Sequence, residues 1–217
     1  MADVIFNGPE GRLEGRYHHS KRSGAPIALI LHPHPQGGGT MNNKVVYTLF
    51  RAFAHRGFSV LRFNFRGVGR SQGLFDNGPG ELSDAASAID WIQSGNGNAP
   101  RCWVAGYSFG AWIGMQLLMR RPEIAGFISV APPANLYDFS FLAPCPSSGL
   151  ILHGTHDDMV PESSVAKLAQ KLSHQRTISI EYRCIDGADH FFRDHLELLQ
   201  KEVNAYLVRA EALIEPA

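Results

Sequence analysis

Short apolar runs rich in β-branched and aromatic residues alternate along the chain with longer segments of helical periodicity. The run IALIL at 27–31 is apolar at every position, which is typical of a strand buried on both faces of a sheet. The first two runs are separated by a turn containing glycine and proline, so they predict an opening hairpin. The predicted strands are 4–6, 13–18, 27–31, 58–65, 103–107, 124–130, 149–152 and 178–184. The predicted helices are 41–55, with Thr40 as its N-cap, 81–93, 109–120, 164–173 and 196–214.

This alternation predicts the α/β class, with eight strands in a mainly parallel sheet and helices on both of its faces. The length of 217 residues suits a single domain over 1–217, and we find no internal repeat, low-complexity tract or linker. The stretch 131–148 is rich in proline and aromatic residues and is too short for a separate cap domain. In sheets of this class, ligands bind at the carboxyl ends of the strands.

The sequence G-Y-S-F-G at 106–110 fits the pattern G-x-S-x-G and lies between an apolar strand and an amphipathic helix. A tight strand-to-helix turn raises the hydroxyl of Ser108 above the edge of the sheet and aims the first helical N–H groups at a developing oxyanion. Small residues on both sides of the turn leave room for neighbouring elements. Ser108 is therefore the candidate nucleophile, and the alternative is a glycine-rich turn with an incidental serine.

A serine hydroxyl is a weak nucleophile at neutral pH and needs a neighbouring base. His190 is the favoured base because it lies on the loop after the last predicted strand, and His195, at the start of the closing helix, is the alternative. The acid that orients the base is expected on a strand-end loop between nucleophile and base. Asp157 and Asp158 both follow the GLIL strand, and Asp157 is favoured; Asp138 is a third candidate.

Acyl transfer to serine also needs hydrogen-bond donors for the oxyanion that forms. The first expected donor is the backbone N–H of Phe109, directly after the nucleophile. The second is expected from the sequence HPHPQGGG at 32–39, which leaves the third strand at the same edge of the sheet. Its two prolines have no N–H, so the donor is His34 or, as the alternative, Gln36.

Several motifs resemble those of the α/β-hydrolase superfamily, and the resemblance covers nearly the whole chain. NFRGVGRS at 64–71 resembles the family's D-x-R-G-x-G-x-S, and HGTHDDMVP at 153–161 resembles its acid loop H-G-x-x-D-x-x-V-P. The chain is most similar to small, lidless bacterial members of the esterase or dienelactone-hydrolase type. The resemblance implies the acid role for Asp157, the base role for His190 and the oxyanion role for His34.

Two positions depart from the family pattern, with Asn64 in place of Asp and Pro33 in place of Gly. Dienelactone hydrolases use a cysteine nucleophile, so Ser108 argues against that particular activity. The resemblance implies a serine hydrolase that cleaves a small acyl ester or thioester through an acyl-enzyme, without cofactor or metal. Lactones and amides are cleaved by the same machinery, and the fold does not choose among these substrates.

Apolar side chains on the strand-end loops are expected to form a shallow wall beside the nucleophile. Ordinary core packing is the alternative for each of them. Because no cap covers the site, we expect the wall to accept acyl chains of roughly two to six carbons and to bury little of a longer one. The expected wall residues are Phe109, Trp112, Phe141 and Phe191, with Leu142 and Phe192 as further candidates.

The charge balance argues against nucleic acid or an anionic membrane as partner, because 20 basic and 20 acidic residues give a formal charge of zero. No apolar run approaches the ~20 residues that cross a bilayer, and the first residues do not resemble a signal peptide. The three cysteines lack CxxC spacing and are interpreted as buried, reduced thiols of a cytoplasmic protein. The expected partners are a small acyl substrate and, by default, a second copy of the chain.

Functions of two other classes stay open. A metal-dependent hydrolase would use His32, His34, His153 and His156 as ligands, although proline and glycine around the first two suit a backbone-donor loop better. The other class is a non-catalytic binding protein of the same fold. Reaction of Ser108 with a fluorophosphonate separates this second class from an enzyme, because a degenerate site does not react.

Overall fold

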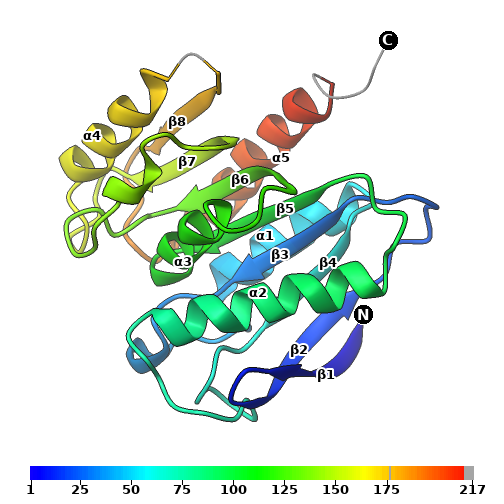
Figure 1. Cartoon of the computed structure of the whole chain (residues 1–217). Coiled ribbons are helices and arrows are strands. Elements are labelled where there is room, and N and C mark those ends of the chain that lie inside the picture. The colour runs from blue at the N-terminus through cyan, green and yellow to red at the C-terminus, as the bar shows by residue number, and fades with distance from the viewer. Residues whose placement is uncertain (176, 213–217) are drawn as a thin grey trace.

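The structure, a computed structural model, describes residues 1–175 and 177–212. Its described strands are β1 (Ala2–Gly8), β2 (Gly11–His18), β3 (Ile27–Leu31), β4 (Ser59–Phe63), β5 (Cys102–Tyr107), β6 (Ile124–Val130), β7 (Ser148–Gly154) and β8 (Ile180–Ile185). They form one sheet in the order β1-β2-β4-β3-β5-β6-β7-β8 (Figure 1). β1 and β2 form an antiparallel hairpin, and β2 is also antiparallel to β4. The other neighbouring pairs are parallel, which confirms the predicted sheet.

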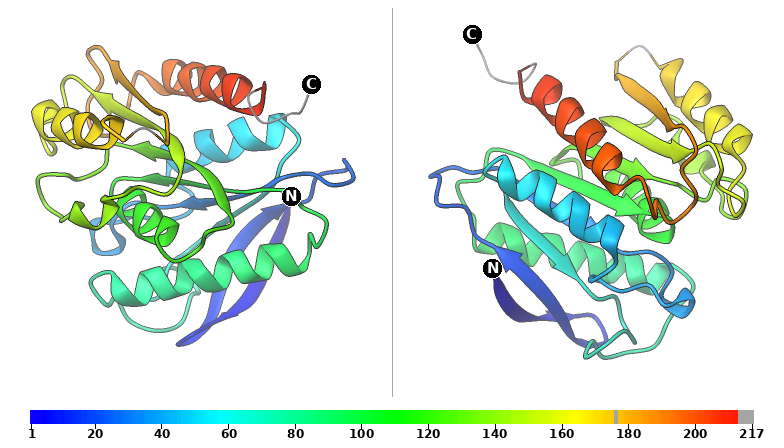
Figure 2. Two further views of the ribbon diagram at one scale, coloured as in Figure 1. Left: turned by 45° about the horizontal axis from the view of Figure 1, so that its top comes forward. Right: turned by 180° about the vertical axis from the view of Figure 1, so that it is seen from behind.

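Helices cover both faces of this sheet. The described helices are η1 (Pro35–Gly37), α1 (Lys44–His55), α2 (Pro79–Ser94), α3 (Phe109–Leu118), η2 (Ser140–Leu142), α4 (Glu162–Ser173) and α5 (Leu196–Ala212), of which η1 and η2 are single 3-10 turns. α2, α3 and α4 lie on one face, and α1 and α5 lie on the other (Figure 2). The apolar residues of each group of helices build a separate core against the sheet. The molecule therefore has three layers.

Strand β3 shows why its sequence is apolar throughout. Ile27, Leu29 and Leu31 pack into the core beneath α2 and α3, whereas Ala28 and Ile30 pack into the core beneath α1 and α5. Successive side chains of a strand point to opposite faces, so a central strand between two helical layers needs apolar residues at every position. The strand lies between β4 and β5 and carries the 32–39 loop at its carboxyl end.

The predicted start of α1 and its predicted cap were wrong. The helix begins after Asn43, whose Oδ1 accepts the backbone N–H groups of Val45 at 2.9 Å and Val46 at 3.4 Å. Thr40 lies one turn earlier, where its carbonyl accepts the N–H of Asn43. Asn is as good an N-cap as Thr, and here the intervening turn selects it. The predicted end of the last helix, at 214, lies outside the described residues.

The prediction of three buried thiols was correct for Cys102 and Cys145 and wrong for Cys184. Cys184 lies on β8, the last strand in the sheet. An edge strand has a neighbouring strand on one side only, so its side chains are less buried than those of a central strand. The Sγ of Cys184 lies 3.6 Å from Oε1 of Glu162 and is exposed. An apolar pattern in a strand therefore did not by itself place the strand in the middle of the sheet.

No cap domain lies over the carboxyl edge of the sheet in the described chain. The connection between β6 and β7 contains only the short turn η2. The relevant edge of the sheet is thus bordered by loops alone (Figure 1). Separately, none of the described helices is long and apolar enough to cross a membrane.

Asn64, which stands where the resembling family has Asp, links three segments near this edge. Its Nδ2 donates to Oε1 of Glu14 at 2.8 Å, and its Oδ1 accepts the N–H of Met41 at 2.8 Å. Glu14 also pairs with Arg70 at 2.9 Å. An aspartate here has no proton to donate and would set a second carboxylate against Glu14, so the neighbouring glutamate explains the asparagine.

Replacing this asparagine by Asn64→Asp is expected to lower the free energy of unfolding at pH 7.5 by about 2 kcal/mol, because two buried carboxylates then face each other. One carboxyl of the pair would have a raised pKa. The folded state would then bind a proton that the unfolded chain does not, so the loss should shrink as the pH falls toward 5. Urea unfolding at several pH values measures this. Adding Glu14→Gln should restore most of the stability at pH 7.5, and a double variant as unstable as Asn64→Asp would contradict the explanation.

Candidate active site

Ser108 occupies the turn between β5 and α3 with φ 54° and ψ −120°. This backbone conformation is strained for a residue with a side chain, and it persists because the surrounding elements enforce it. A Cβ at Gly106 would collide with the backbone of Gly110 and Ala111, so the turn can close only with glycine there. The backbone N–H of Ser108 donates to the carbonyl of Val130 at the end of β6. The serine is thereby held at the carboxyl edge of the sheet.

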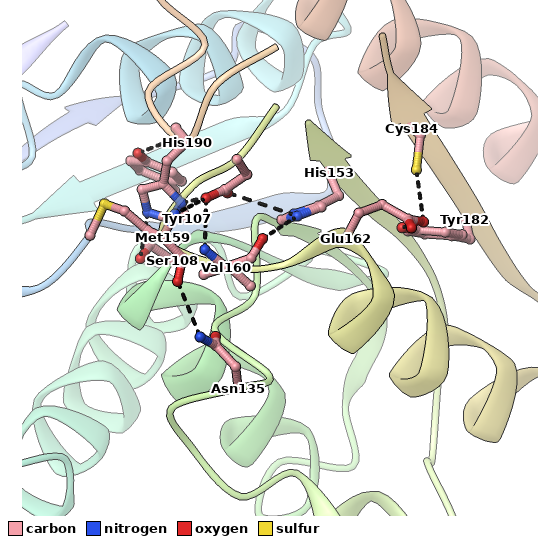
Figure 3. A network of polar contacts seen from close by, with 11 residues as sticks. Tyr107, Ser108, Asn135, His153, Met159, Val160, Glu162, Tyr182, Cys184 and His190 are labelled. Carbon is pink, nitrogen blue, oxygen red and sulfur yellow. Dashed lines mark hydrogen bonds and ion pairs between the residues drawn. The ribbon is translucent and has the colours of Figure 1, made fainter. Parts of the chain in front are cut away.

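His190 connects Ser108 to Asp157 through its two ring nitrogens (Figure 3). Nε2 lies 3.2 Å from Oγ of Ser108, and Nδ1 lies 2.7 Å from Oδ2 of Asp157. A carboxylate only accepts hydrogen bonds, so Nδ1 carries the proton of the neutral ring and Nε2 is free to accept the proton of Ser108. The three side chains come from loops after β5, β7 and β8.

Asp157 is buried and its carboxylate is held by the turn that carries it. Oδ1 accepts the backbone N–H of Val160 at 2.8 Å and of Met159 at 2.9 Å. Burial acts to raise the pKa of Asp157, but the hydrogen bonds from His190 and from Val160 outweigh it and bring the pKa below its usual value. The carboxylate is therefore ionised at neutral pH and able to orient the imidazole.

His153, near the end of β7 and four residues before Asp157, contacts the same turn. Its Nε2 donates to the carbonyl of Val160 at 2.9 Å and lies 3.8 Å from Oδ2 of Asp157 (Figure 3). Burial lowers the pKa of His153 despite the nearby carboxylate, so the ring is neutral there. The first residue of the H-G-x-x-D pattern thus packs against the fourth following residue, a contact that sequence reasoning did not identify.

The alternative acids and base lie elsewhere. Asp158 is exposed, and Asp138 accepts the N–H of Ser140 at 2.8 Å and its hydroxyl at 2.6 Å. His195 precedes α5, and its carbonyl accepts the N–H of Leu199. Of the candidates raised by the sequence, the structure brings together Ser108, His190 and Asp157.

The two candidate oxyanion donors border the turn. The N–H of Phe109 is in the first turn of α3, and the described residues offer it no acceptor. In the 32–39 loop, the N–H of Gln36 donates to Nδ1 of His34 at 3.2 Å, so Gln36 is already engaged. The N–H of His34 has no acceptor in the described part of the chain. Between the two alternatives, this geometry favours His34.

Aromatic side chains line this region, although not all in the expected manner. Phe109 is 1% exposed, so its ring backs the wall instead of presenting a face to solvent. Trp112 stacks on Tyr137 with ring centroids 4.3 Å apart, and its Nε1 donates to the carbonyl of Asp138. Phe141 is partly buried against the core and stacks on Phe139.

Phe191 and Phe192 are neighbours in the chain but differ in burial. Phe191 is 47% exposed, and its ring lies 5.5 Å from that of His190 in an edge-to-face arrangement. Phe192 is fully buried in the core under α5, and Leu142 is buried in the opposite core, so both were wrong as wall candidates. The backbone of Phe192 has a positive φ of 52°.

Two aromatic residues of the wall were missed from the sequence. Phe75 lies between the rings of His34 at 4.9 Å and Phe109 at 5.9 Å. Tyr137 follows β6 and contacts both Phe109 and Trp112. Both lie in loops after strands of the sheet, so the rule that ligands bind at strand ends would have included them.

The histidines proposed for a metal site do not form one in the described residues. Nε2 of His32 accepts the N–H of Phe65 at 3.0 Å, so Nδ1 carries the proton and contacts the carbonyl of Pro33 at 2.6 Å. Burial lowers the pKa of His32 to about 4, so the ring is neutral, and both nitrogens are engaged. No group of three or more potential metal ligands occurs among the described side chains.

Comparison with known proteins agrees with this geometry. A family model described as X-Pro dipeptidyl-peptidase (S15 family) matches residues 17–177. The uncharacterized protein RP471 of Rickettsia prowazekii is 53% identical over 216 residues, which cover 98% of this chain and 91% of that protein.

Two solved structures share the fold over nearly their full lengths. ATU1826 of Agrobacterium tumefaciens, a candidate α/β hydrolase, has a TM-score of 0.94 and 64% identity and covers 96% of this chain and 95% of its own. XC6422 of Xanthomonas campestris, described as an α/β serine hydrolase without a lid, has a TM-score of 0.87 and 32% identity and covers 96% and 94%. These relatives support hydrolase activity for the present chain.

The choice of acid is tested by comparing Asp157→Asn with Asp158→Asn. An amide at 157 donates toward Nδ1 of His190, which moves the ring proton to Nε2 and leaves no acceptor for the proton of Ser108. By analogy with a serine-protease triad, kcat should fall on the order of 10⁴-fold. Asp158→Asn should stay within about tenfold of the wild type, because that side chain is exposed. If Asp158→Asn is the more damaging change, Asp158 is the acid.

Proposed function

This chain belongs to the X-Pro dipeptidyl-peptidase (S15) family and so to the α/β-hydrolase superfamily, and we propose that it is a serine hydrolase cleaving small carboxylic esters or thioesters. The observation that carries the proposal is the pair of contacts made by His190, 3.2 Å to Ser108 and 2.7 Å to Asp157. A nucleophile that contacts a base, which in turn contacts an orienting acid, is the arrangement needed for acyl transfer to serine.

In the proposed reaction, Oγ of Ser108 attacks the acyl carbon while Nε2 of His190 takes its proton. Asp157 stabilises the imidazolium that forms and keeps its Nδ1 directed at the carboxylate. When the tetrahedral intermediate collapses, His190 returns the proton to the leaving alcohol or thiol, and the acyl group stays on Ser108. Water then repeats the attack with His190 again as base, which releases the acid and restores the serine.

The negative charge that develops on the acyl oxygen needs donors that are fixed in advance. We assign this role to the backbone N–H groups of Phe109 and His34. Support comes from Phe109, the first residue of α3, whose N–H has no acceptor among the described residues, and from Gln36, whose own amide is engaged by the His34 ring. Backbone donors on two separate loops keep their distance without any side-chain rearrangement.

Three of the carboxylates near the site already have hydrogen-bond partners, which favours an ester over a peptide with a free amino terminus. A dipeptidyl-peptidase must hold the terminal ammonium of its substrate, and carboxylates are the natural partners of an ammonium group. Asp157 is engaged by His190, and Glu81, whose charge acts on His34 and Tyr137, accepts two backbone N–H groups. Asp138 is engaged by a neighbouring serine. These carboxylates already have partners, and the wall itself is aromatic.

With p-nitrophenyl esters, kcat/KM is expected to be highest for acyl chains of roughly two to six carbons. Each buried CH₂ contributes about 0.8 kcal/mol, or nearly fourfold, until the chain passes the aromatic wall. The apolar side chains of Leu136 and Met159, in the loops that follow β6 and β7, are exposed and would bury little of a longer acyl chain. A series of esters of increasing length, assayed below their solubility limits, measures the optimum. A continued rise with longer acyl chains would show a deeper acyl site than proposed.

The same assay includes two controls. Ser108→Ala should lower kcat by several orders of magnitude with an unchanged circular dichroism spectrum, because the hydroxyl contributes little to folding. Activity that survives in Ser108→Ala would contradict the serine mechanism. Faster cleavage of Xaa-Pro anilides than of the esters would leave the triad intact and replace the ester assignment with a peptidase.

A further inference from the structure

Tyr107 precedes the nucleophile and contacts the base. Its side chain is 1% exposed, and its hydroxyl donates to the backbone carbonyl of His190 at 2.8 Å (Figure 3). The two rings also pack together, with centroids 5.5 Å apart and planes inclined by 38°. One side chain on β5 therefore holds both the backbone and the ring of a residue 83 positions later in the chain.

The base has to reach across the sheet, because β6 and β7 lie between β5 and β8. Its loop is tied to the acid loop at the upstream end, where the carbonyl of Ala188 accepts the N–H of His156 and the N–H of Gly187 donates to Thr155. Downstream, the buried ring of Phe192 anchors it in the core. The Tyr107 hydroxyl holds the loop between these two anchors, at His190 itself.

In the hydrogen bond between Tyr107 and His190, only the phenol can be the donor. A carbonyl oxygen only accepts, so the phenol must be the donor. Burial raises the pKa of Tyr107, so the hydroxyl keeps its proton throughout the range in which a serine hydrolase works. A buried phenol hydroxyl also needs a partner, and this carbonyl is the partner it has.

We propose that Tyr107 is a positioning residue for the base: its hydroxyl fixes the His190 loop relative to the strand that carries Ser108, so that the imidazole stays in reach of both Ser108 and Asp157. This role rests on the proposed serine-hydrolase function. A fixed loop matters because a displacement of the base by about 1 Å can cost on the order of 100-fold in rate.

The test is Tyr107→Phe, which keeps the ring and its core contacts and removes only the donor. We expect kcat for p-nitrophenyl acetate and the rate constant of labelling by diisopropyl fluorophosphonate to fall together, by about 10- to 100-fold, with KM within about twofold. The labelling rate reports on nucleophile and base without depending on the natural substrate. Unchanged kcat and labelling in folded Tyr107→Phe would overturn the role.

A matched control separates positioning from stability. Ser147→Ala removes another buried hydroxyl that donates to a backbone carbonyl at 2.8 Å, that of Ile124, at the opposite edge of the sheet. It should lower the melting temperature by a similar amount and leave kcat and labelling at wild-type values. Equal losses of activity in both variants, or a Tyr107→Phe protein that does not fold while Ser147→Ala does, would assign the hydroxyl to stability instead.

A double-mutant cycle gives a second readout. In an Asp157→Asn background the imidazole is already misoriented, so adding Tyr107→Phe should cost less than threefold in labelling, far below its effect in the wild type. Equal effects in the two backgrounds would contradict the role. If the wild-type protein is not labelled at all, the proposed serine-hydrolase function fails; if the wild type is labelled and Tyr107→Phe is labelled equally fast, only the Tyr107 role fails.

Discussion

The close approach of α3 to the ends of β3 and β5 is the constraint on which the site depends. A Cβ at Gly110 would collide with the backbone of Leu31 and His32, just as one at Gly106 would collide with the start of the helix. The turn at Ser108 therefore packs directly against the point where the 32–39 loop leaves β3. This close backbone packing, permitted by two glycines, places Ser108 beside the loop to which we assign the second oxyanion donor.

The acid and the base depend on a similar contact between neighbouring strands. A Cβ at Gly154, the last residue of β7, would collide with the carbonyl of Ala188, so the acid loop and the base loop touch at their origins. The hydrogen bond between Asp157 and His190 extends this contact outward from the sheet. Because β7 and β8 are parallel neighbours, the loops that follow them lie at the same edge of the sheet, so that residues far apart in sequence can contact each other there. Two strands, β6 and β7, lie between the strand of Ser108 and β8, and the base loop spans that gap.

Local patterns were sufficient to predict the sheet and to select the three residues that the structure brings together, because each follows a buried strand within a short motif. The sequence could not distinguish Phe191 from Phe192, since the burial of the second ring depends on the core that distant segments build around it. It also could not explain Asn64, whose partner Glu14 is 50 residues away. The exposure of Cys184 depends on β8 being an edge strand, and strand order is a property of the whole fold. Pairings between distant segments decided each of these cases.

The central claim is that Ser108 forms a covalent acyl-enzyme with His190 as base. It is tested most directly with an aryl carbamate, because a carbamoyl-enzyme is hydrolysed slowly enough to be isolated and mapped by mass spectrometry. The account predicts one carbamoyl group per chain, on the peptide that contains Ser108, formed in the wild type and not in Ser108→Ala, and formed far more slowly when His190 is replaced by alanine. Hydrolysis of the carbamate without an adduct, or an adduct on another residue, would contradict it.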